Sequence, residues 1–216
     1  MARASDARVI ITGRNPDRLA SAGEELQVST ATLHLTDTEG IHAFFAGLTC
    51  AVDHVLVSGG APTYAPIASL DLGVALQVLD EHLLGSLRVA RECAQGLRPG
   101  GSLTFITGSH ARHPGPNLTI AAILAAALPT ITANAALELA PTRVNAVAAG
   151  FVDTPLSARL LGDELRPRLL RLQETLPIRR VVGSTDVAKA VIHLMTNTAV
   201  TGATFDVDGG QQLISS

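Results

Sequence analysis

At 216 residues, the chain has the length of one α/β domain with one large core. Hydrophobic residues make up 47% of the sequence, but aromatic residues only 3%, so we expect an aliphatic core. The net charge of −3 excludes the strongly basic surface on which nucleic-acid binding depends. The composition therefore predicts one soluble domain over residues 1–216, with no nucleic-acid partner.

The chain shows no targeting or metal-binding pattern. Its start, MARASDARVIITG, lacks the uninterrupted apolar segment of a signal peptide. The most apolar region, residues 120–139, is interrupted by Pro129 and polar residues, so we expect no membrane span. Cys50 and Cys93 have neither CxxC nor metal-ligand spacing, and we interpret both as reduced packing residues. A cytoplasmic protein without a membrane partner is expected.

Strands and helices alternate along the chain. Expected strands, rich in β-branched residues and bounded by turn residues, cover residues 8–13, 30–35, 54–58, 102–107, 143–147 and 204–207. One helix starts at the Asn-Pro-Asp of residues 15–17, and Thr36-Asp37 caps the next. Further helices are expected at residues 72–97, 120–139 and 186–195, and residues 156–172 are expected to form a helix and a mobile arm.

This alternation predicts right-handed crossovers and a doubly wound parallel sheet with helices on both faces. In such a sheet, ligands bind outside the carboxyl ends of the strands. We therefore expect the loops at residues 108–116 and 150–155 to form two walls of one cleft.

Six segments resemble, in order and spacing, the short-chain dehydrogenase/reductase family. They are GRNPDRL, VDHVLVSGG, LRPGGSLTFITGS, LELAPTRVNAVAAG, FVDTP and TGATFDVDGG, and the resemblance runs from residue 8 to the end. It implies a Rossmann-like sheet, abbreviated at the N-terminus, and an NAD(P)-dependent oxidoreductase acting on a carbonyl or alcohol substrate.

The resemblance also implies cofactor contacts. Arg14, next to Gly13, matches the basic residue that binds a 2′-phosphate in NADP-preferring members. A guanidinium suits this task because its planar fork meets a phosphate bidentately. The alternative for Arg14 is a solvated side chain near a helix start.

Two further segments match cofactor-contacting positions of the family. Ser58, Gly59 and Gly60 replace its Asn-Ala-Gly, where small residues let the backbone approach the cofactor. A tight turn after a strand would need the same glycines. Val152 and Thr154 match the segment that touches the nicotinamide amide and the phosphates.

The catalytic positions are largely replaced. Ser109 matches the serine that hydrogen-bonds the substrate oxygen, but Ala121 and Ala125 stand where the family has its Tyr and Lys. Methyl groups cannot transfer protons. The only tyrosine, Tyr64, and the only lysine, Lys189, cannot form another Tyr-x-x-x-Lys pair.

Histidines are the remaining candidates for proton transfer, because they titrate in the required range. His82 takes the position of the family's relay asparagine, and His110 is a second candidate. Surface or packing roles are the alternative. Ser109 lacks the G-x-S-x-G pattern of a hydrolase, and His110 with His113 is weak evidence for a metal.

The family's first strand and its glycine-rich turn are also missing, since the sequence begins at the family's second strand. We expect residues 8–12 to pair directly with residues 55–57. The alternatives are a split sheet completed by a partner chain, or a longer natural protein.

The sequence is compatible with two functions. The first is an oxidoreductase with a degenerate active site, which binds NADP or NAD if it binds a cofactor and acts on a small-molecule substrate. The second is a catalytically silent homologue that binds a small molecule or assembles into oligomers. The apolar helices at residues 79–89 and 120–139 favour a homodimer or homotetramer.

Overall fold

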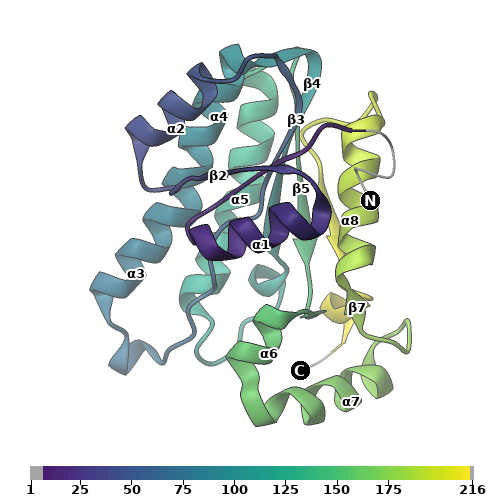
Figure 1. Cartoon of the computed structure of the whole chain (residues 1–216). Coiled ribbons are helices and arrows are strands. Elements are labelled where there is room, and N and C mark those ends of the chain that lie inside the picture. Colours follow the sequence, from purple (N-terminus) through teal and green to yellow (C-terminus); the bar gives the residue numbers. More distant parts are fainter. Residues whose placement is uncertain (1–6, 215–216) are drawn as a thin grey trace.

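The strands in the described part of the protein run parallel to their partners, and they form three groups (Figure 1). The computed structural model describes residues 7–214, apart from the side chain of His110. The four-stranded group has the order β3 (Val52–Val57), β4 (Leu97–Gly108), β5 (Arg143–Ala149) and β8 (Thr204–Val207). The two pairs are β1 (Ile10–Gly13) with β2 (Ser29–Thr32), and β6 (Val152–Asp153) with β7 (Val182–Gly183).

Helices cover both faces of the strands, as a doubly wound fold requires (Figure 1). One face carries α2 (Thr38–Ala46), α4 (Gly85–Gly96) and α5 (Thr119–Glu138), and the other carries α1 (Pro16–Leu26) and α8 (Ser184–Thr196). Helix α3 (Leu72–Leu79) continues into α4 through a π-helical turn at Asp80–Leu84. Helices α6 (Pro155–Leu161) and α7 (Leu165–Thr175) follow β6, over the residues where the sequence predicted a helix and a mobile arm.

The predicted helix starts are confirmed by their caps. The Asn15 side chain accepts a hydrogen bond from the Arg18 backbone N–H at 2.9 Å, and Pro16 occupies the first turn of α1. Asp37 accepts from the Gly40 N–H at 2.9 Å and begins α2. These side chains satisfy backbone donors that have no partner inside the helix.

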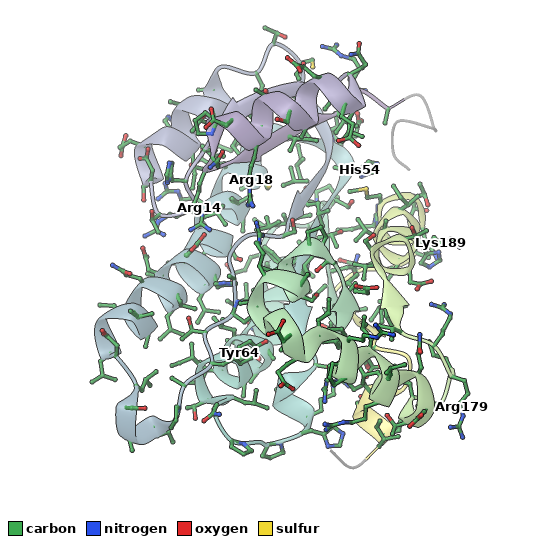
Figure 2. The ribbon with its side chains drawn as sticks, turned by 60° about the horizontal axis from the view of Figure 1, so that its bottom comes forward. Arg14, Arg18, His54, Tyr64, Arg179 and Lys189 are labelled. Atoms are coloured by element: carbon green, nitrogen blue, oxygen red, sulfur yellow. The ribbon has the colours of Figure 1, made fainter. Side chains whose placement is uncertain are left out.

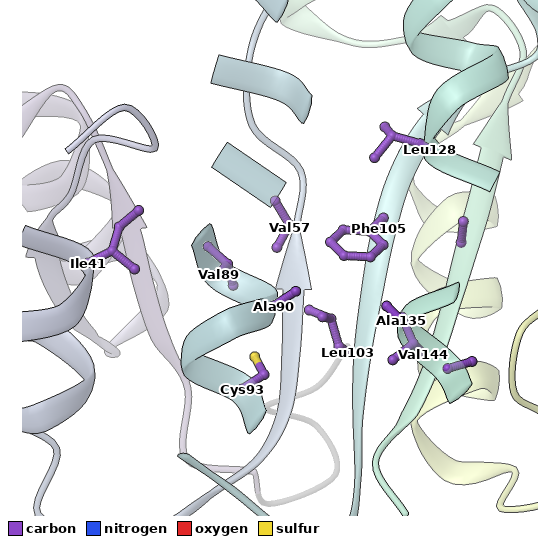
Figure 3. Packing of buried hydrophobic residues seen from close by; sticks show 12 residues of the cluster. Ile41, Val57, Val89, Ala90, Cys93, Leu103, Phe105, Leu128, Ala135 and Val144 are labelled. Carbon is purple, nitrogen blue, oxygen red and sulfur yellow. The ribbon is translucent and has the colours of Figure 1, made fainter. Parts of the chain in front are cut away.

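The core lies between the central strands and the layer of α4 and α5 (Figure 3). Leu103 and Phe105 on β4 are fully buried, as is Val144 on β5. Phe105 is the one aromatic residue among these buried side chains, and alanine, valine, leucine and isoleucine supply most of the rest. The prediction of an aliphatic core is confirmed.

The predicted pairing of residues 8–12 with residues 55–57 is wrong. β1 pairs with β2, from Ile10 opposite Ser29 to Gly13 opposite Thr32, and among the described strands β3 pairs only with β4. The reason lies in α2, because Ile41 packs into the same core as Val89 and Cys93 of α4. The β1–β2 unit is therefore anchored through the helix layer, at a position where β1 and β3 do not form hydrogen bonds.

Two smaller expectations also need correction. Pro129 and the polar residues of this region were expected to leave no sufficiently apolar segment, yet by length and composition alone α5 is apolar enough to cross a membrane; in this structure it packs against β4 and β5. Cys50 is exposed and is no packing residue, whereas Cys93 is buried as expected. Burial, together with the nearby Glu92 carboxylate, raises the pKa of the Cys93 thiol to about 12, so this thiol stays protonated.

Candidate functional site

Ser109 lies at the carboxyl end of β4, next to the end of β5. Its backbone N–H donates to the Ala149 carbonyl at 3.1 Å, and its own carbonyl accepts from the Arg112 N–H at 3.1 Å, within the short 3₁₀ helix at His110–Arg112. Gly108 is registered opposite Ala149. The two loops predicted to form walls of one site therefore start side by side.

The C-terminal loop fixes both of these loops. The Arg112 guanidinium lies 2.8 Å from Asp206 and 3.0 Å from the Gln212 side-chain oxygen. The Phe151 N–H donates to Gln211 Oε1 at 2.8 Å, and His113 Nε2 contacts the Gln212 carbonyl oxygen. The loop itself is folded around Asp208, whose buried carboxylate accepts from the backbone N–H groups of residues 210 and 212.

His82 lies in the π-helical turn between α3 and α4, a feature that often marks functional positions. Its Nε2 is buried and has no hydrogen-bond partner among the described residues. Burial lowers the pKa of His82, opposed by the Ala61 backbone and Glu81, so the ring is neutral above pH 6.5. The α5 helix packs against both this turn and the 3₁₀ helix after Ser109, so both predicted catalytic positions belong to one region.

The two glycines after β3 are explained by packing. A Cβ on Gly59 would overlap the Leu35 side chain, and a Cβ on Gly60 would overlap the His82 ring. Gly60 also has φ = +84°, which favours glycine. Glycine is therefore required at Gly60 by its backbone conformation and by the His82 ring, as the tight-turn alternative supposed, whereas a side chain at Gly59 would need the Leu35 side chain to shift.

Arg14 directly follows Gly13 at the carboxyl end of β1. Its Nη1 lies 3.1 Å from both carboxylate oxygens of Glu81, in the same π-helical turn as His82. The Arg14 side chain remains 57% exposed. The residue predicted to bind a phosphate thus lies at the carboxyl end of a strand, and the Glu81 carboxylate partly neutralises its charge.

Val152 and Thr154 lie beyond the end of β5. Val152 pairs with Val182 in the short β6–β7 sheet. The Thr154 hydroxyl caps α6, accepting from the Ser157 N–H at 3.2 Å and lying 2.8 Å from the Ser157 hydroxyl. The hydroxyl of Thr154 therefore already has a local structural role.

Ala121 and Ala125 are both 4% exposed, in the half of α5 that follows the serine loop. Tyr64 lies on the loop after β3 and is 43% exposed, while Lys189 lies on α8, well separated from it (Figure 2). Partial burial raises the pKa of Tyr64. Neither residue replaces the missing pair on α5.

The described residues offer little support for a metal site. Within residues 7–214, leaving aside the His110 side chain, no group of three His, Cys, Asp or Glu side chains is placed to hold a metal ion. The His110 side chain lies outside the described part of the structure. His113 contacts the C-terminal loop through the Gln212 carbonyl oxygen, so that its Nε2 has a structural partner.

Comparison with known proteins identifies the lineage. The family model described as enoyl-(acyl carrier protein) reductase matches residues 1–212. Dehydrogenase/reductase SDR family member 4 of Sus scrofa is 32% identical over 220 residues, covering 94% of this chain and 78% of the relative. The chain belongs to the short-chain dehydrogenase/reductase family. It is thus a member of a family of NAD(P)-dependent oxidoreductases.

Two solved structures of this family extend the comparison. A small-chain dehydrogenase in complex with NADPH is 26% identical, with a TM-score of 0.83 over 96% of this chain and 100% of that chain. A short-chain dehydrogenase/reductase from Brucella melitensis has a TM-score of 0.89 over 99% of this chain and 89% of its own, at 20% identity. The second likeness concerns the fold alone, and it confirms the predicted Rossmann-like α/β class.

Sequence reasoning missed the C-terminal loop. The contacts of Arg112 with Asp206 and Gln212 join residues about one hundred positions apart. The Asp208-Gly209-Gly210 turn was the available signal, because an aspartate before two glycines indicates a tight turn with positive φ.

Proposed function

We propose that this short-chain dehydrogenase/reductase is an NADP-preferring oxidoreductase for a carbonyl or alcohol substrate, with a degenerate proton-transfer site. The observation that carries the proposal is the combination of Ser109 at the end of β4 with buried methyl groups at Ala121 and Ala125. The serine that orients a substrate oxygen is retained. The side chains that would transfer a proton to or from that oxygen are replaced by alanines.

The residues at the end of β1 fit the 2′-phosphate end of NADP. Arg14 offers an exposed guanidinium at the carboxyl end of a strand, where dinucleotides bind in this class of fold. The segment after Gly13 has no second glycine before Gly23, so this segment forms no glycine-rich turn for the pyrophosphate. The expected affinity is therefore moderate and depends strongly on Arg14.

When bound, the cofactor supplies the hydride, and the remaining tasks belong to this chain. The Ser109 hydroxyl donates a hydrogen bond to the substrate carbonyl and polarises it. His82 is the proposed source of the proton, because its Nε2 is buried without a partner among the described residues. Since burial lowers the pKa of His82, this role predicts faster reduction as the pH falls below 6.5.

The alternative function is a catalytically silent homologue that binds a small molecule. Ala121 and Ala125 favour it directly, because no methyl group can replace a phenol or an ammonium group. The two functions share the same binding site and differ only in turnover.

Assembly into a homodimer or homotetramer forms part of the proposal. A groove of about 430 Å³ lies between α4 and α5, lined by small residues such as Ala94 and Ala135 and by Leu87 and Ile131. Leu87 is 44% exposed in the isolated chain. A second copy would cover this apolar surface.

Titration with NADPH and NADH tests the proposal. The chain has no tryptophan, so the emission of NADPH itself reports binding. We expect saturable micromolar binding of NADPH, and Arg14→Ala should weaken it about tenfold while leaving NADH unchanged. Arg18→Ala, one turn along α1, is the matched control and should stay within about twofold.

Turnover then separates the two functions. Reduction of a panel of aldehydes and ketones that is lost in Ser109→Ala and increases below pH 6.5 supports the oxidoreductase. Binding without turnover supports the silent homologue. Absence of binding at millimolar NADPH would contradict the cofactor proposal.

A further inference from the structure

Three of the described arginines are buried or half-buried, namely Arg88, Arg143 and Arg168. The Arg88 guanidinium pairs with Asp80 at 2.8 Å, and that of Arg143 donates to backbone carbonyl oxygens at and after the end of α8. No described oxygen accepts a hydrogen bond from Arg168. This guanidinium has therefore lost part of its hydration without gaining the oxygen partners that the other two have.

A carboxylate close in sequence does not pair with Arg168. Glu164 precedes it by four residues, and a glutamate one turn before a cation is the favourable order for an ion pair on a helix. Among the described residues, no ion pair within 4 Å joins these two side chains. The guanidinium carbon lies instead over the Phe151 ring, 5.9 Å from its centre, at a distance where a cation and an aromatic ring attract each other. This contact directs no N–H donor at an oxygen, so the donors remain free for an anion.

Arg168 lies on the face of α7 that is turned toward the protein. Leu172, four residues later, is buried, whereas Arg166, two residues earlier, is exposed. Residues four apart share one face of a helix, and residues two apart do not. No nitrogen of Arg168 is enclosed without a partner, so the guanidinium still faces space that a ligand can enter.

Phe151 places Arg168 at the end of the sheet that carries Ser109. The Ala149 carbonyl, at the end of β5, accepts a hydrogen bond from the Ser109 N–H at 3.1 Å, and Phe151 follows two residues later. The Phe151 N–H is itself held by Gln211 Oε1 at 2.8 Å. Helix α7 lies at this same end of the molecule (Figure 1). The serine and the arginine are thus positioned by the ends of two neighbouring strands, β4 and β5.

A second arginine adds to the positive charge at this position. Arg171 lies three residues after Arg168, and residues three apart are neighbours on a helix surface. Burial and the charge of Arg171 lower the pKa of Arg168, because both disfavour its charged form. Glu174, the acidic residue of α7, forms no ion pair with either arginine among the described residues. A bound anion would offset this repulsion.

We propose that Arg168, oriented by Phe151, selects an anionic substrate, namely a carbonyl or alcohol compound that carries a carboxylate or a phosphate group. The inference rests on the proposed oxidoreductase function and names the substrate class of that same site. Ser109 hydrogen-bonds the reacting oxygen, and Arg168 binds the anionic end through the paired N–H donors of its fork. A neutral compound of the same shape leaves the guanidinium unpaired and therefore binds more weakly.

Binding of matched probes in the absence of cofactor tests this site separately from catalysis. One pair is 4-formylbenzoate with its methyl ester, and the other is dihydroxyacetone phosphate with dihydroxyacetone. Isothermal titration calorimetry measures each dissociation constant. We expect at least one anion to bind about tenfold more tightly than its neutral partner, and the pair that shows the preference distinguishes a carboxylate from a phosphate.

Variants of the chain locate the binding. Arg168→Met keeps a long side chain beside Phe151 but removes the charge, so the preference for the anion should fall to about twofold or less. Arg166→Met, on the exposed face of α7, is the matched control and should keep the preference. Arg14→Ala should keep it as well, because the anion is not bound at the proposed cofactor site. If Arg168→Met does not fold, the NMR amide signal of Phe151 in the unaltered chain decides, since the anion alone should shift it.

Two results would overturn the proposal. One is equal binding of the anion and its neutral partner in both pairs, and the other is a preference for the anion that Arg168→Met retains. Failure of the oxidoreductase proposal is distinguishable, because NADPH binding or turnover would then be absent while the preference for the anion persists without cofactor. Where turnover is measured, Arg168→Met should raise KM for the anionic substrate with little change in kcat, since it removes binding remote from the reacting oxygen.

Discussion

The two sides of this sheet are stabilised differently. β5 has hydrogen-bonded neighbours on both sides, and every residue from Arg143 to Ala148 is buried. β1 has one neighbour, and its residues alternate between exposed and half-buried. The first side is held by backbone pairing, and the second by side-chain contacts of α2 with α4. We expect the β1–β2 unit to open at a lower free energy than the rest of the fold.

The largest effect is expected in the central strands. Phe105→Ala removes a fully buried ring from β4 and should lower the free energy of unfolding by about 3–5 kcal/mol. Urea denaturation measures it. Ile10→Ala on β1, where the side chain is 44% exposed, is the contrast and should cost about 1 kcal/mol or less. Equal losses of unfolding free energy in Phe105→Ala and Ile10→Ala would contradict the inference that the two sides of the sheet are stabilised differently.

Ala121→Tyr with Ala125→Lys tests whether these two positions of α5 are buried or open toward the serine loop. Both positions are 4% exposed, so the added side chains should destabilise the fold by about 1–3 kcal/mol at each site and give no gain in carbonyl reduction. The control shifts the same pair by one residue, to Ala122→Tyr with Ala126→Lys, where the first position is half-buried and the second is exposed. A gain in turnover without loss of stability would show that these positions open toward the serine loop.

Arg88→Met probes the link between the two sides. It removes the hydrogen bonds to the Leu35 carbonyl and the Thr38 hydroxyl, and the ion pair with Asp80 at 2.8 Å. We expect a loss of about 1–3 kcal/mol, with faster amide exchange confined to β1 and β2. Arg98→Met, which breaks an exposed ion pair at 3.5 Å, should change stability by about 0.5 kcal/mol or less.

The smallest effect concerns pH. Burial lowers the pKa of His54, as it does that of His82, so the unfolded chain takes up protons first. Stability from these groups is complete above pH 6.5 and is lost as the pH falls through their lowered pKa values. Urea midpoints on either side of pH 6.5 measure it. His82→Asn should reduce the dependence of the urea midpoint on pH. An unchanged dependence would contradict the contribution attributed to His82.

Local signals in the sequence were sufficient for most of the elements. The caps at Asn15 and Asp37 fixed the starts of α1 and α2, because a short polar side chain satisfies backbone donors wherever it precedes a helix. The β-branched runs located β3, β5 and β8 to within a few residues.

The pairing of the strands and the close neighbours of the site residues were harder to predict from the sequence. The pairing of β1 depends on α2 packing against α4, which no pattern within residues 8–12 contains. The contacts of Gly59 with Leu35 and of Gly60 with His82 are likewise set by tertiary packing. The family resemblance supplied the position of Ser109, whereas the long-range contacts of Arg112 had no local signature.

The contacts of Asp206, Gln211 and Gln212 bear on how the protein matures during synthesis. These residues fix the serine loop and the segment at Phe151, yet Asp206 lies in β8, the last described strand, and Gln211 and Gln212 leave the ribosome after it. N-terminal parts of a chain fold first during translation. The sheet can therefore form while the nascent chain is still attached, but the Ser109 region is fastened only once residue 212 has emerged. A chain that stops directly after Val207 would keep every described strand and lose the contacts that Gln211 and Gln212 make with the two loops.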